Sequence, residues 1–206
     1  MKYEWKKAEK ALYLPPKTPV QVDVPEQKFF VLHGRGDPNG EAFGEAVGAL
    51  YALSYTVKML PRQGITPEGY FEYGVYPLEA VWDLAEEARG KAGWNKEDFV
   101  YDVMIRQPDF VDAALAADVI EMALRKRKNP LLAQVAFRAI TDGSCVQMLH
   151  VGPYDDEPAS FAQMDAFCAE NGLERASKLH REIYWNDARK TAPEKLKTVI
   201  RYAVKR

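Results

Sequence analysis

The sequence predicts an α+β fold made of two similar halves. Stretches that alternate apolar and polar residues, as half-buried strands do, occur beside stretches with helical spacing. One pattern also occurs twice: Phe30–His33, a loop rich in Gly, Pro and Asp, and a helix from Glu41 are matched by Gln147–His150, a similar loop, and a helix from Pro158. The copies are 117 residues apart at the strand and 118 at the helix. We therefore expect two tandem β-α-β-β modules about a pseudo-twofold axis, with a ligand cleft between them.

The first half, expected over about 19–107, starts with a strand in which Val20, Val22 and Val24 alternate with polar residues. The loop over 34–40 is rich in glycine and proline, and we expect its glycines to need positive φ angles. Further strands are expected at 29–32, 70–76 and 99–106, and a helix is expected over 41–57, before Pro61 and Gly64.

The second half, expected over about 108–206, starts with a helix for which Asp109 is the expected N-cap. The strand-like runs 131–140 and 145–151 are expected to form a hairpin, because the pair Asp142-Gly143 between them is a strong turn signal. Both halves together are expected to form one domain over residues 1–206.

A third helix is expected after residue 157, with an apolar stripe of Phe161, Met164 and Cys168 and an end at Asn171-Gly172. An extended piece over 179–185 and a C-terminal amphipathic segment follow.

Composition excludes several classes of protein. The 206 residues carry a net charge of −2 and a pI of about 6.0, which removes the positive footprint of a nucleic-acid-binding protein. No stretch approaches the ~20 apolar residues that span a bilayer, and the first residues contain no hydrophobic region of signal-peptide length, so we expect no signal peptide there. Cys145 and Cys168 lie in apolar segments and are expected to be reduced core residues. We therefore expect a cytoplasmic protein that binds neither nucleic acid nor membrane; its oligomeric state stays open.

Metal and covalent chemistry find little support in the sequence. His33, His150 and His180 are far apart, and none has a second ligand at a helical spacing such as H-E-x-x-H. The run His180-Arg181-Glu182 is like half of a zinc deaminase signature, but no P-C-x-x-C follows it. Neither cysteine has a neighbouring base in the sequence. We expect no metal and no cofactor.

Acids beside aromatic residues are the more informative pattern, since Phe, Trp and Tyr make 12% of the chain. On a strand, Glu182 and Tyr184 point to the same face, opposite Ile183 and Trp185. If that face met an aromatic-walled cleft, the carboxylate would attract cations or polarise water, and the rings would stack on a planar ligand. The alternative is an edge strand whose Glu182 faces solvent.

At this point the chain resembles a known family over almost its whole length, through several long, ordered motifs. It is similar to the stand-alone cytosolic branch of the GyrI-like small-molecule-binding family. The matching stretches are Tyr3-Glu4-Trp5-Lys6-Lys7, Gly34-x-Gly36-Asp37-Pro38-Asn39, Pro77-Leu78-Glu79-x-x-Trp82, Met104-Ile105-Arg106-Gln107-Pro108-Asp109-Phe110, Leu149-His150-x-Gly152-Pro153-Tyr154-Asp155-Asp156-Glu157-Pro158, His180-x-Glu182-Ile183-Tyr184 and Pro193-Glu194-Lys195-Leu196-Lys197-Thr198.

The resemblance implies a hydrophobic, aromatic-lined cleft with an acidic residue that binds bulky, often planar or cationic compounds. The stand-alone branch is similar to cyclopropanoid cyclopropyl hydrolases, which detoxify DNA-alkylating natural products of the yatakemycin type by adding water to the strained ring.

Carried over by motif, the family's acid falls on Glu182, beside Tyr184. Glu79 and Trp82 would contribute to substrate binding, and Tyr154 would assist catalysis by hydrogen-bonding the oxygen that gains charge. Two further wall residues, Tyr55 and Tyr101, are suggested by spacing alone. Trp185 and Arg181 depart from the family pattern, and either could reshape or partly neutralise the site.

Three functions remain open from the sequence. The first is a hydrolase in which Glu182 orients or deprotonates a water molecule inside an aromatic cage. The second is a protein that sequesters or senses planar, hydrophobic or cationic compounds, with Glu182 as a counter-ion. The third is an interaction protein with a macromolecular partner. The same rings and the same acid serve the first two, so the sequence does not separate hydrolysis from sequestration.

Overall fold

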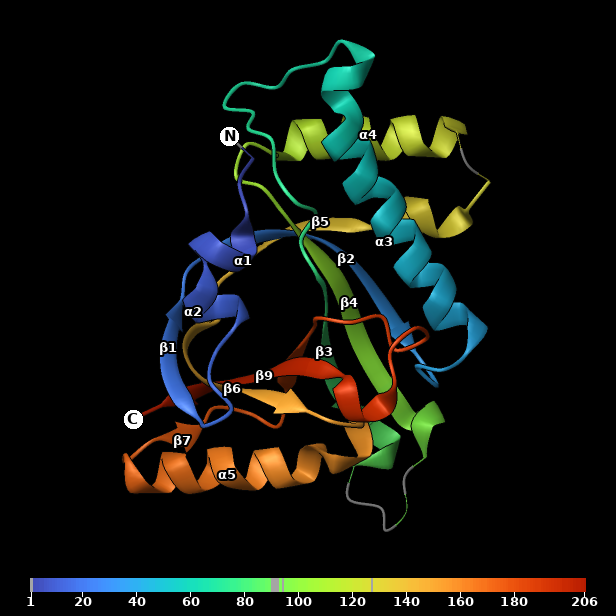
Figure 1. The fold of residues 1–206 in the computed structure, drawn as a ribbon. Coiled ribbons are helices and arrows are strands. Elements are labelled where there is room, and N and C mark those ends of the chain that lie inside the picture. The colour runs from blue at the N-terminus through green and yellow to red at the C-terminus, as the bar shows by residue number, and fades with distance from the viewer. Residues whose placement is uncertain (1, 90–92, 94, 127) are drawn as a thin grey trace. The chain divides into compact units, whose positions relative to one another are not determined.

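The computed structural model describes residues 2–89, 93, 95–126 and 128–206, which form a mixture of helices and antiparallel strands (Figure 1). The predicted α+β class is confirmed.

The α-helices are α1 (Trp5–Ala8), α2 (Lys10–Tyr13), α3 (Glu41–Met59), α4 (Ala113–Lys126) and α5 (Glu157–Glu170). The strands are β1 (Val20–Val24), β2 (Gln27–Arg35), β3 (Leu78–Leu84), β4 (Phe99–Gln107), β5 (Ala136–Ile140), β6 (Gly143–Val151), β7 (Glu174–Arg175), β8 (His180–Tyr184) and β9 (Lys197–Lys205). Short 3₁₀ helices are η1 (Leu60–Gln63), η2 (Glu86–Ala88), η3 (Lys96–Asp98), η4 (Pro130–Gln134), η5 (Tyr154–Asp156) and η6 (Pro193–Lys195).

The repeat predicted from the sequence is present in the order of these elements. The first copy runs β2, α3, β3, β4 and the second runs β6, α5, β8, β9. In each copy the first strand pairs antiparallel with the last, as β2 does with β4 and β6 with β9. The duplicated β-α-β-β order is therefore confirmed.

The chain divides into two compact units that do not coincide with a cut at one point of the sequence. Unit 1 is Met1–Glu4, Gln27–Leu78 and Asp83–Ile140, and unit 2 is Trp5–Glu26, Glu79–Trp82 and Thr141–Arg206.

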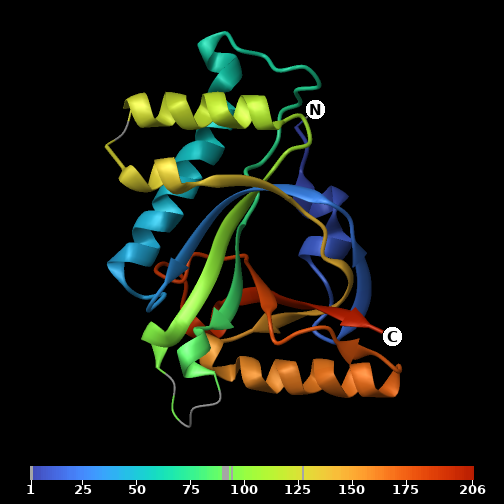
Figure 2. The same ribbon diagram turned by 180° about the vertical axis from the view of Figure 1, so that it is seen from behind.

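Unit 1 is a small antiparallel sheet covered by two helices. Strand β2 pairs with β4 on one side and with β5 on the other. Helix α3 packs on β2 and β4, and α4 packs on α3 (Figure 2). The buried side chains of α3 include Ala46, Leu50, Leu53 and Val57, which recur at helical spacing and explain why this segment is a helix.

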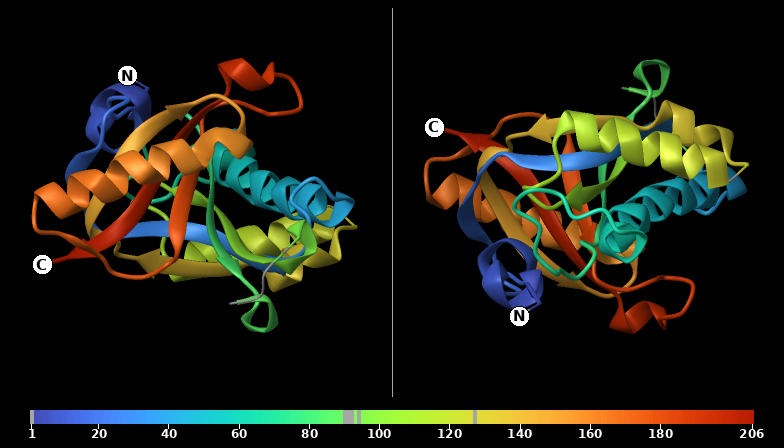
Figure 3. Two further views of the ribbon diagram at one scale, coloured as in Figure 1. Left: turned by 90° about the horizontal axis from the view of Figure 1, so that it is seen from below. Right: turned by 90° about the horizontal axis from the view of Figure 1, so that it is seen from above.

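Unit 2 contains a sheet with the strand order β1-β6-β9-β8. Residues 79–82 of β3 pair with β8, and the short strand β7 pairs with β9. Helix α5 lies along one face of this sheet (Figure 3). Its Met164 and Cys168 form a core with Val146 and Met148 of β6 and with Ile200 and Tyr202 of β9. This packing holds the middle and the last part of α5 against the sheet.

Some of the expectations about local structure are wrong. Residues 70–76 are not a strand: only Tyr73 makes an isolated bridge, to Tyr3, and the strand β3 begins after Pro77. The aromatic rings of this stretch instead form a cluster, in which Phe71 lies 5.4 Å from Phe110 and Tyr73 lies 6.0 Å from it. The C-terminal amphipathic segment is the nine-residue strand β9.

The expected hairpin around Asp142-Gly143 is also wrong. Strand β5 pairs with β2 in unit 1, whereas β6 pairs with β1 and β9 in unit 2. Gly143 does adopt the positive φ of 64° that a turn residue provides, but the chain passes between units there. The carboxylate of Asp142 has a different use, described below. The N-cap of α4 is Asp112 rather than Asp109, because its Oδ1 accepts the backbone N–H of Leu115 at 2.8 Å.

The glycine-rich loop was expected to need positive φ throughout. Gly36 does adopt a φ of 110°, but Gly34 lies inside β2 opposite Tyr101 and has an ordinary backbone conformation. A Cβ at Gly34 would lie 2.4 Å from the ring of Tyr101. Gly34 therefore makes room for that ring. Among the described residues, no helix combines the length and the apolar character needed to cross a membrane.

Candidate functional site

Glu182 lies in the middle of the unit 2 sheet and not at an edge. Strand β8 pairs with β9 on one side and with β3 on the other, so that Glu182 stands between Ile200 and Ala80. Glu182 is only 8% exposed. The alternative of an edge strand with a solvent-facing Glu182 is therefore wrong.

The side chains of Glu182, Tyr184 and Trp82 form a hydrogen-bonded chain on one face of the sheet. The Tyr184 hydroxyl donates to Glu182 Oε2 at 2.7 Å, and it accepts the indole N–H of Trp82 at 2.9 Å. Burial and the nearby Glu182 raise the pKa of Tyr184 well above its usual value, so the phenol stays a proton donor at neutral pH. The expected common face of Glu182 and Tyr184 is confirmed.

His180 provides a second hydrogen bond to the same carboxylate. Its Nε2 lies 3.0 Å from Glu182 Oε1. An ionised carboxylate only accepts hydrogen bonds, so this geometry places the proton on Nε2. The imidazole ring is held edge-on against Phe161 of α5, with ring centroids 4.9 Å apart. Both oxygens of Glu182 are thus held in place by neighbours on its own strand.

Glu157 is a second buried acid at this site, and the sequence reasoning did not single it out. It is the first residue of α5 and is 7% exposed. Burial, the negative charge of Glu182 and a side-chain hydrogen bond with Glu182 raise the pKa of Glu157 to about 9. Two carboxyl groups this close do not both ionise at neutral pH, so Glu157 is the one that keeps a proton.

Tyr154 of η5 adds an aromatic wall. Its ring meets that of Tyr184 edge to face with centroids 6.0 Å apart, and it is 38% exposed. Burial, first of all, and the acids Glu182 and Glu157 raise its pKa to about 12. The phenol is therefore a hydrogen-bond donor at neutral pH.

The loop that carries Tyr154 and Glu157 is fixed by a buried histidine. His150, at the end of β6, has Nε2 3.1 Å from the carbonyl oxygen of Pro153 and Nδ1 2.9 Å from the hydroxyl of Ser160 in α5. A carbonyl oxygen only accepts, so Nε2 of His150 donates to the oxygen of Pro153. These bonds tie the loop and the first turn of α5 to the sheet.

One group of residues has the spacing of metal ligands. Among the described residues, Glu157, His180 and Glu182 bring one ligand atom each within 4.8 Å of the others. In this arrangement His180 Nε2 lies within hydrogen-bond distance of Glu182 Oε1, at 3.0 Å. The arrangement can bind a ligand between rings, accept a proton and donate one.

Glu79, expected at this site, lies on the other face of the same sheet. The register pairs it with Ile183, whereas Ala80 is paired with Glu182. Its Oε2 accepts a hydrogen bond from Arg181 at 3.0 Å, and Arg181 also donates to both oxygens of Asp142 at 2.8 and 2.9 Å. Arg181 thus bonds to Glu79 and Asp142, on the face of the sheet opposite Glu182.

Trp185, the other departure from the family pattern, also serves packing. Its indole N–H donates to the backbone oxygen of Tyr13 at 2.5 Å, and its ring meets Trp5 with centroids 6.0 Å apart. It therefore fastens the N-terminal helices to β8.

Tyr55 and Tyr101 belong to unit 1. Tyr55, on α3, is half exposed and its ring centroid lies 6.3 Å from that of Tyr51. Tyr101, on β4, is buried over Gly34 and meets Phe43 edge to face at 5.0 Å. Their assignment as walls of the site stays a prediction.

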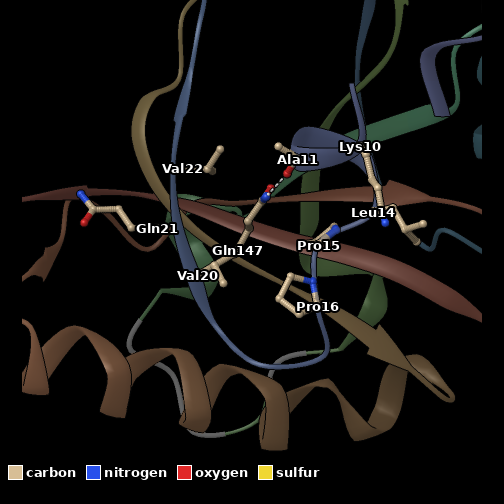
Figure 4. Close-up of a pocket in the computed structure, with 9 residues that line it drawn as sticks. All are labelled: Lys10, Ala11, Leu14, Pro15, Pro16, Val20, Gln21, Val22 and Gln147. Atoms are coloured by element: carbon tan, nitrogen blue, oxygen red, sulfur yellow. Dashed lines mark hydrogen bonds between the residues drawn. The ribbon is translucent and has the colours of Figure 1, made fainter. Parts of the chain in front are cut away.

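A hollow of about 320 Å³ lies elsewhere in unit 2, between α2, the prolines after it and β1 (Figure 4). Its wall includes Gln147, whose Nε2 donates to the backbone oxygen of Ala11 at 2.6 Å and whose Oε1 accepts from Arg201 at 3.0 Å. The amide is fully used within the protein, and the register places Gln147 on the face opposite Glu182.

The bridging hydroxyl of Tyr184 gives a prediction about stability. In Tyr184→Phe, Trp82 loses its acceptor and Glu182 loses a donor in a buried setting, so the free energy of unfolding should fall by about 1–3 kcal/mol. Urea denaturation measures this. Tyr55→Phe, at a half-exposed position, is the matched control and should change stability by less than about 0.5 kcal/mol. Equal, small effects in both variants would contradict the hydrogen-bonded chain.

The chain is similar over almost its whole length to several solved structures. A crystal structure described as a hydrolase from Listeria innocua has 35% sequence identity and a TM-score of 0.91, with 100% of each chain covered. A second, also described as a hydrolase from that organism, has 34% identity and a TM-score of 0.89 over 99% of this chain and 100% of that one. A third, described as an uncharacterized conserved protein from Listeria innocua, has 37% identity and a TM-score of 0.89 over the same shares. No curated protein matches the chain.

The family assignment rests on nearly the full length of the chain. Residues 17–205 match the family described as the GyrI-like small molecule binding domain. The matched range includes the whole network around Glu182, from Trp82 to Tyr184. The chain therefore belongs to the GyrI-like small-molecule-binding family.

Proposed function

We propose that this protein is a hydrolase of electrophilic small molecules, and that its substrates are planar cyclopropane-bearing alkylators of the yatakemycin type. The observation that carries the proposal is the buried carboxylate of Glu182, held by Tyr184 and His180 beside the rings of Trp82 and Tyr154. The two similar proteins described as hydrolases support a hydrolytic activity.

In the proposed reaction the substrate ring stacks against Tyr154 and Trp82, and Glu182 removes a proton from a water molecule as its oxygen bonds to the cyclopropane CH₂. The ring C–C bond breaks, and its electron pair moves through the conjugated system to the carbonyl oxygen. The Tyr154 phenol hydrogen-bonds that oxygen as charge develops on it. Because ring strain already lowers the barrier, holding the water in position supplies much of the acceleration.

Sequestration without turnover is the second candidate. Its specific support is that Glu157 and Glu182 together carry one negative charge among aromatic rings, which suits a planar cation. In this reading Glu182 is a counter-ion, and the bound compound leaves unchanged.

The test is incubation of the protein with a cyclopropane-bearing alkylator of the yatakemycin class, followed by chromatography and mass spectrometry. A sample without protein measures spontaneous ring opening. The proposal predicts a product heavier by one water molecule, formed with many turnovers per protein. Unchanged compound that co-elutes with the protein would favour sequestration, and no interaction would overturn both candidates.

A further inference from the structure

The turn that carries Tyr154 is joined to the sheet through one carbonyl group. Tyr154 is the first residue of η5, and the carbonyl oxygen of Pro153 before it accepts two hydrogen bonds. The backbone N–H of Asp156 donates to it at 3.0 Å, which closes the turn. Nε2 of His150 lies 3.1 Å from the same oxygen and joins the turn to strand β6. His150 therefore helps to set the position of the turn relative to its strand.

The chain bends sharply between β6 and this turn. Gly152 has a φ of 140°, a conformation that residues with a side chain rarely adopt, and its N–H donates to the carbonyl oxygen of Leu196 at 3.1 Å. The pairing of β6 with β9 ends just before it, at Val151 and Lys197. The bond from His150 to Pro153 spans this bend and connects the turn back to the strand.

His150 has a second arm, which reaches helix α5. Its Nδ1 lies 2.9 Å from the hydroxyl of Ser160, and both residues are buried. Helix α5 is also held by the core around its Met164 and Cys168, so it does not depend on this arm alone. The arm to Pro153, by contrast, acts on a three-residue 3₁₀ helix whose Tyr154 is partly exposed. Loss of that arm should therefore loosen Tyr154 more than loss of the other arm loosens α5.

We propose that His150 is a positioning residue of this site, which acts through the carbonyl group of Pro153 to hold the ring and the hydroxyl of Tyr154 in place for the substrate. The inference rests on the proposed function, in which Tyr154 stacks on the substrate and hydrogen-bonds its carbonyl oxygen. The imidazole acts through the turn, because both of its nitrogens are bonded within the protein. Misplacing a positioned group by about 1 Å can lower a rate by about 10²-fold, so the effect is large enough to measure.

Two conservative variants of His150 separate its arms. The amide nitrogen of glutamine lies near the position of Nε2, so His150→Gln keeps a donor for Pro153. The amide of asparagine lies near the position of Nδ1, so His150→Asn keeps a partner for Ser160 and loses the arm to the turn.

The turnover of a yatakemycin-class alkylator compares these variants. In His150→Asn, kcat/KM should fall by about 10-fold or more, whereas His150→Gln should keep most of the wild-type rate. Ser160→Ala removes only the arm to α5 and is the matched control, with nearly wild-type turnover expected. Equal losses of kcat/KM in His150→Asn and His150→Gln would overturn the proposal.

A double-mutant cycle with Tyr154→Ala shows whether the effect passes through Tyr154. Without the tyrosine ring there is nothing left to position, so adding His150→Asn should lower kcat/KM no further. The loss of stability caused by His150→Asn, measured by urea denaturation, should by contrast be similar with and without Tyr154. A further loss of kcat/KM as large as that in the wild-type background would overturn the proposal.

Binding of Nile red, a neutral planar dye, gives a readout that does not depend on turnover. His150→Asn should weaken dye binding in the same direction as Tyr154→Ala, and His150→Gln should not. Wild-type dye binding and wild-type turnover in His150→Asn would overturn the role of His150 alone. A wild type that binds the dye but adds no water to the alkylator would overturn the proposed hydrolysis, and the dye would then decide the role of His150. A wild type that does neither would overturn both.

Discussion

Turnover of the cyclopropane substrate should fall by about 10²-fold or more in Glu182→Gln, while a neutral planar compound should bind with nearly unchanged Kd. The amide fills the same space, and its single oxygen accepts the hydroxyl of Tyr184, while its NH₂ group lies beside His180. It has no basic oxygen to take the proton of water, so the loss is in kcat and not in binding. A planar cation should bind more weakly to the variant, because the charge of the acid pair is gone.

Steady-state kinetics and dye titration of the same preparations measure this. Glu170→Gln controls for the removal of any single acid from the chain, since this residue is exposed on α5. Wild-type turnover in Glu182→Gln would show that the carboxylate is not the base. A Kd for neutral compounds that rises as much as kcat falls would show that Glu182 acts in binding.

The second large effect should be on stability, in Arg181→Met. Arg181 is 5% exposed, and it is bonded to Glu79, which is 1% exposed, and to Asp142. Removing the guanidinium leaves the Glu79 carboxylate buried beside fewer positive charges, which typically lowers the free energy of unfolding by about 3–5 kcal/mol. Chemical denaturation at neutral pH measures the change.

Two further variants test whether the loss of stability in Arg181→Met comes from a buried charge without its partner. Arg189→Met removes an exposed arginine that pairs with Asp187 at 2.9 Å, and should cost less than about 1 kcal/mol. The double variant Arg181→Met, Glu79→Leu removes both charges and should recover much of the lost stability. A double variant less stable than Arg181→Met would contradict the buried-charge explanation.

The sequence predicted those helices and strands in which apolar residues recur regularly because one side of the element is buried. The strand at 20–24 and the helix over 41–57 are present because apolar residues recur on one side of each and are more buried there than on the other side. The alternation at 70–76 failed, because those aromatic rings are gathered by contacts with one another and not by a neighbouring strand. Periodicity alone does not distinguish the two causes.

The acid at the site was predictable in part. Period-2 alternation placed Glu182 and Tyr184 on one face, as the structure has them. The same rule separates Glu79 from Trp82, which are three residues apart on β3 and so point to opposite faces, but the sequence argument grouped them by motif.

Glu157 was missed because it is one of three consecutive acids, of which Asp155 and Asp156 are exposed. A helical signal did exist: the buried positions of α5 are Glu157, Ser160, Met164 and Cys168, and seven residues before Met164 is Glu157. Its contact with Glu182, by contrast, joins residues 25 positions apart and depends on how α5 packs on the sheet.

The central claim is that Glu182 acts as a base toward water, and one single-turnover experiment tests it most directly. Excess protein is mixed with a yatakemycin-class alkylator in water enriched in heavy oxygen, and the product is analysed by mass spectrometry. Attack by water predicts that the heavy oxygen is in the product of the first turnover. Light oxygen in that product would mean that a carboxylate of the protein attacked the ring and was then hydrolysed as an ester, and a stable adduct on the protein would make it a sacrificial scavenger; either result would contradict the account.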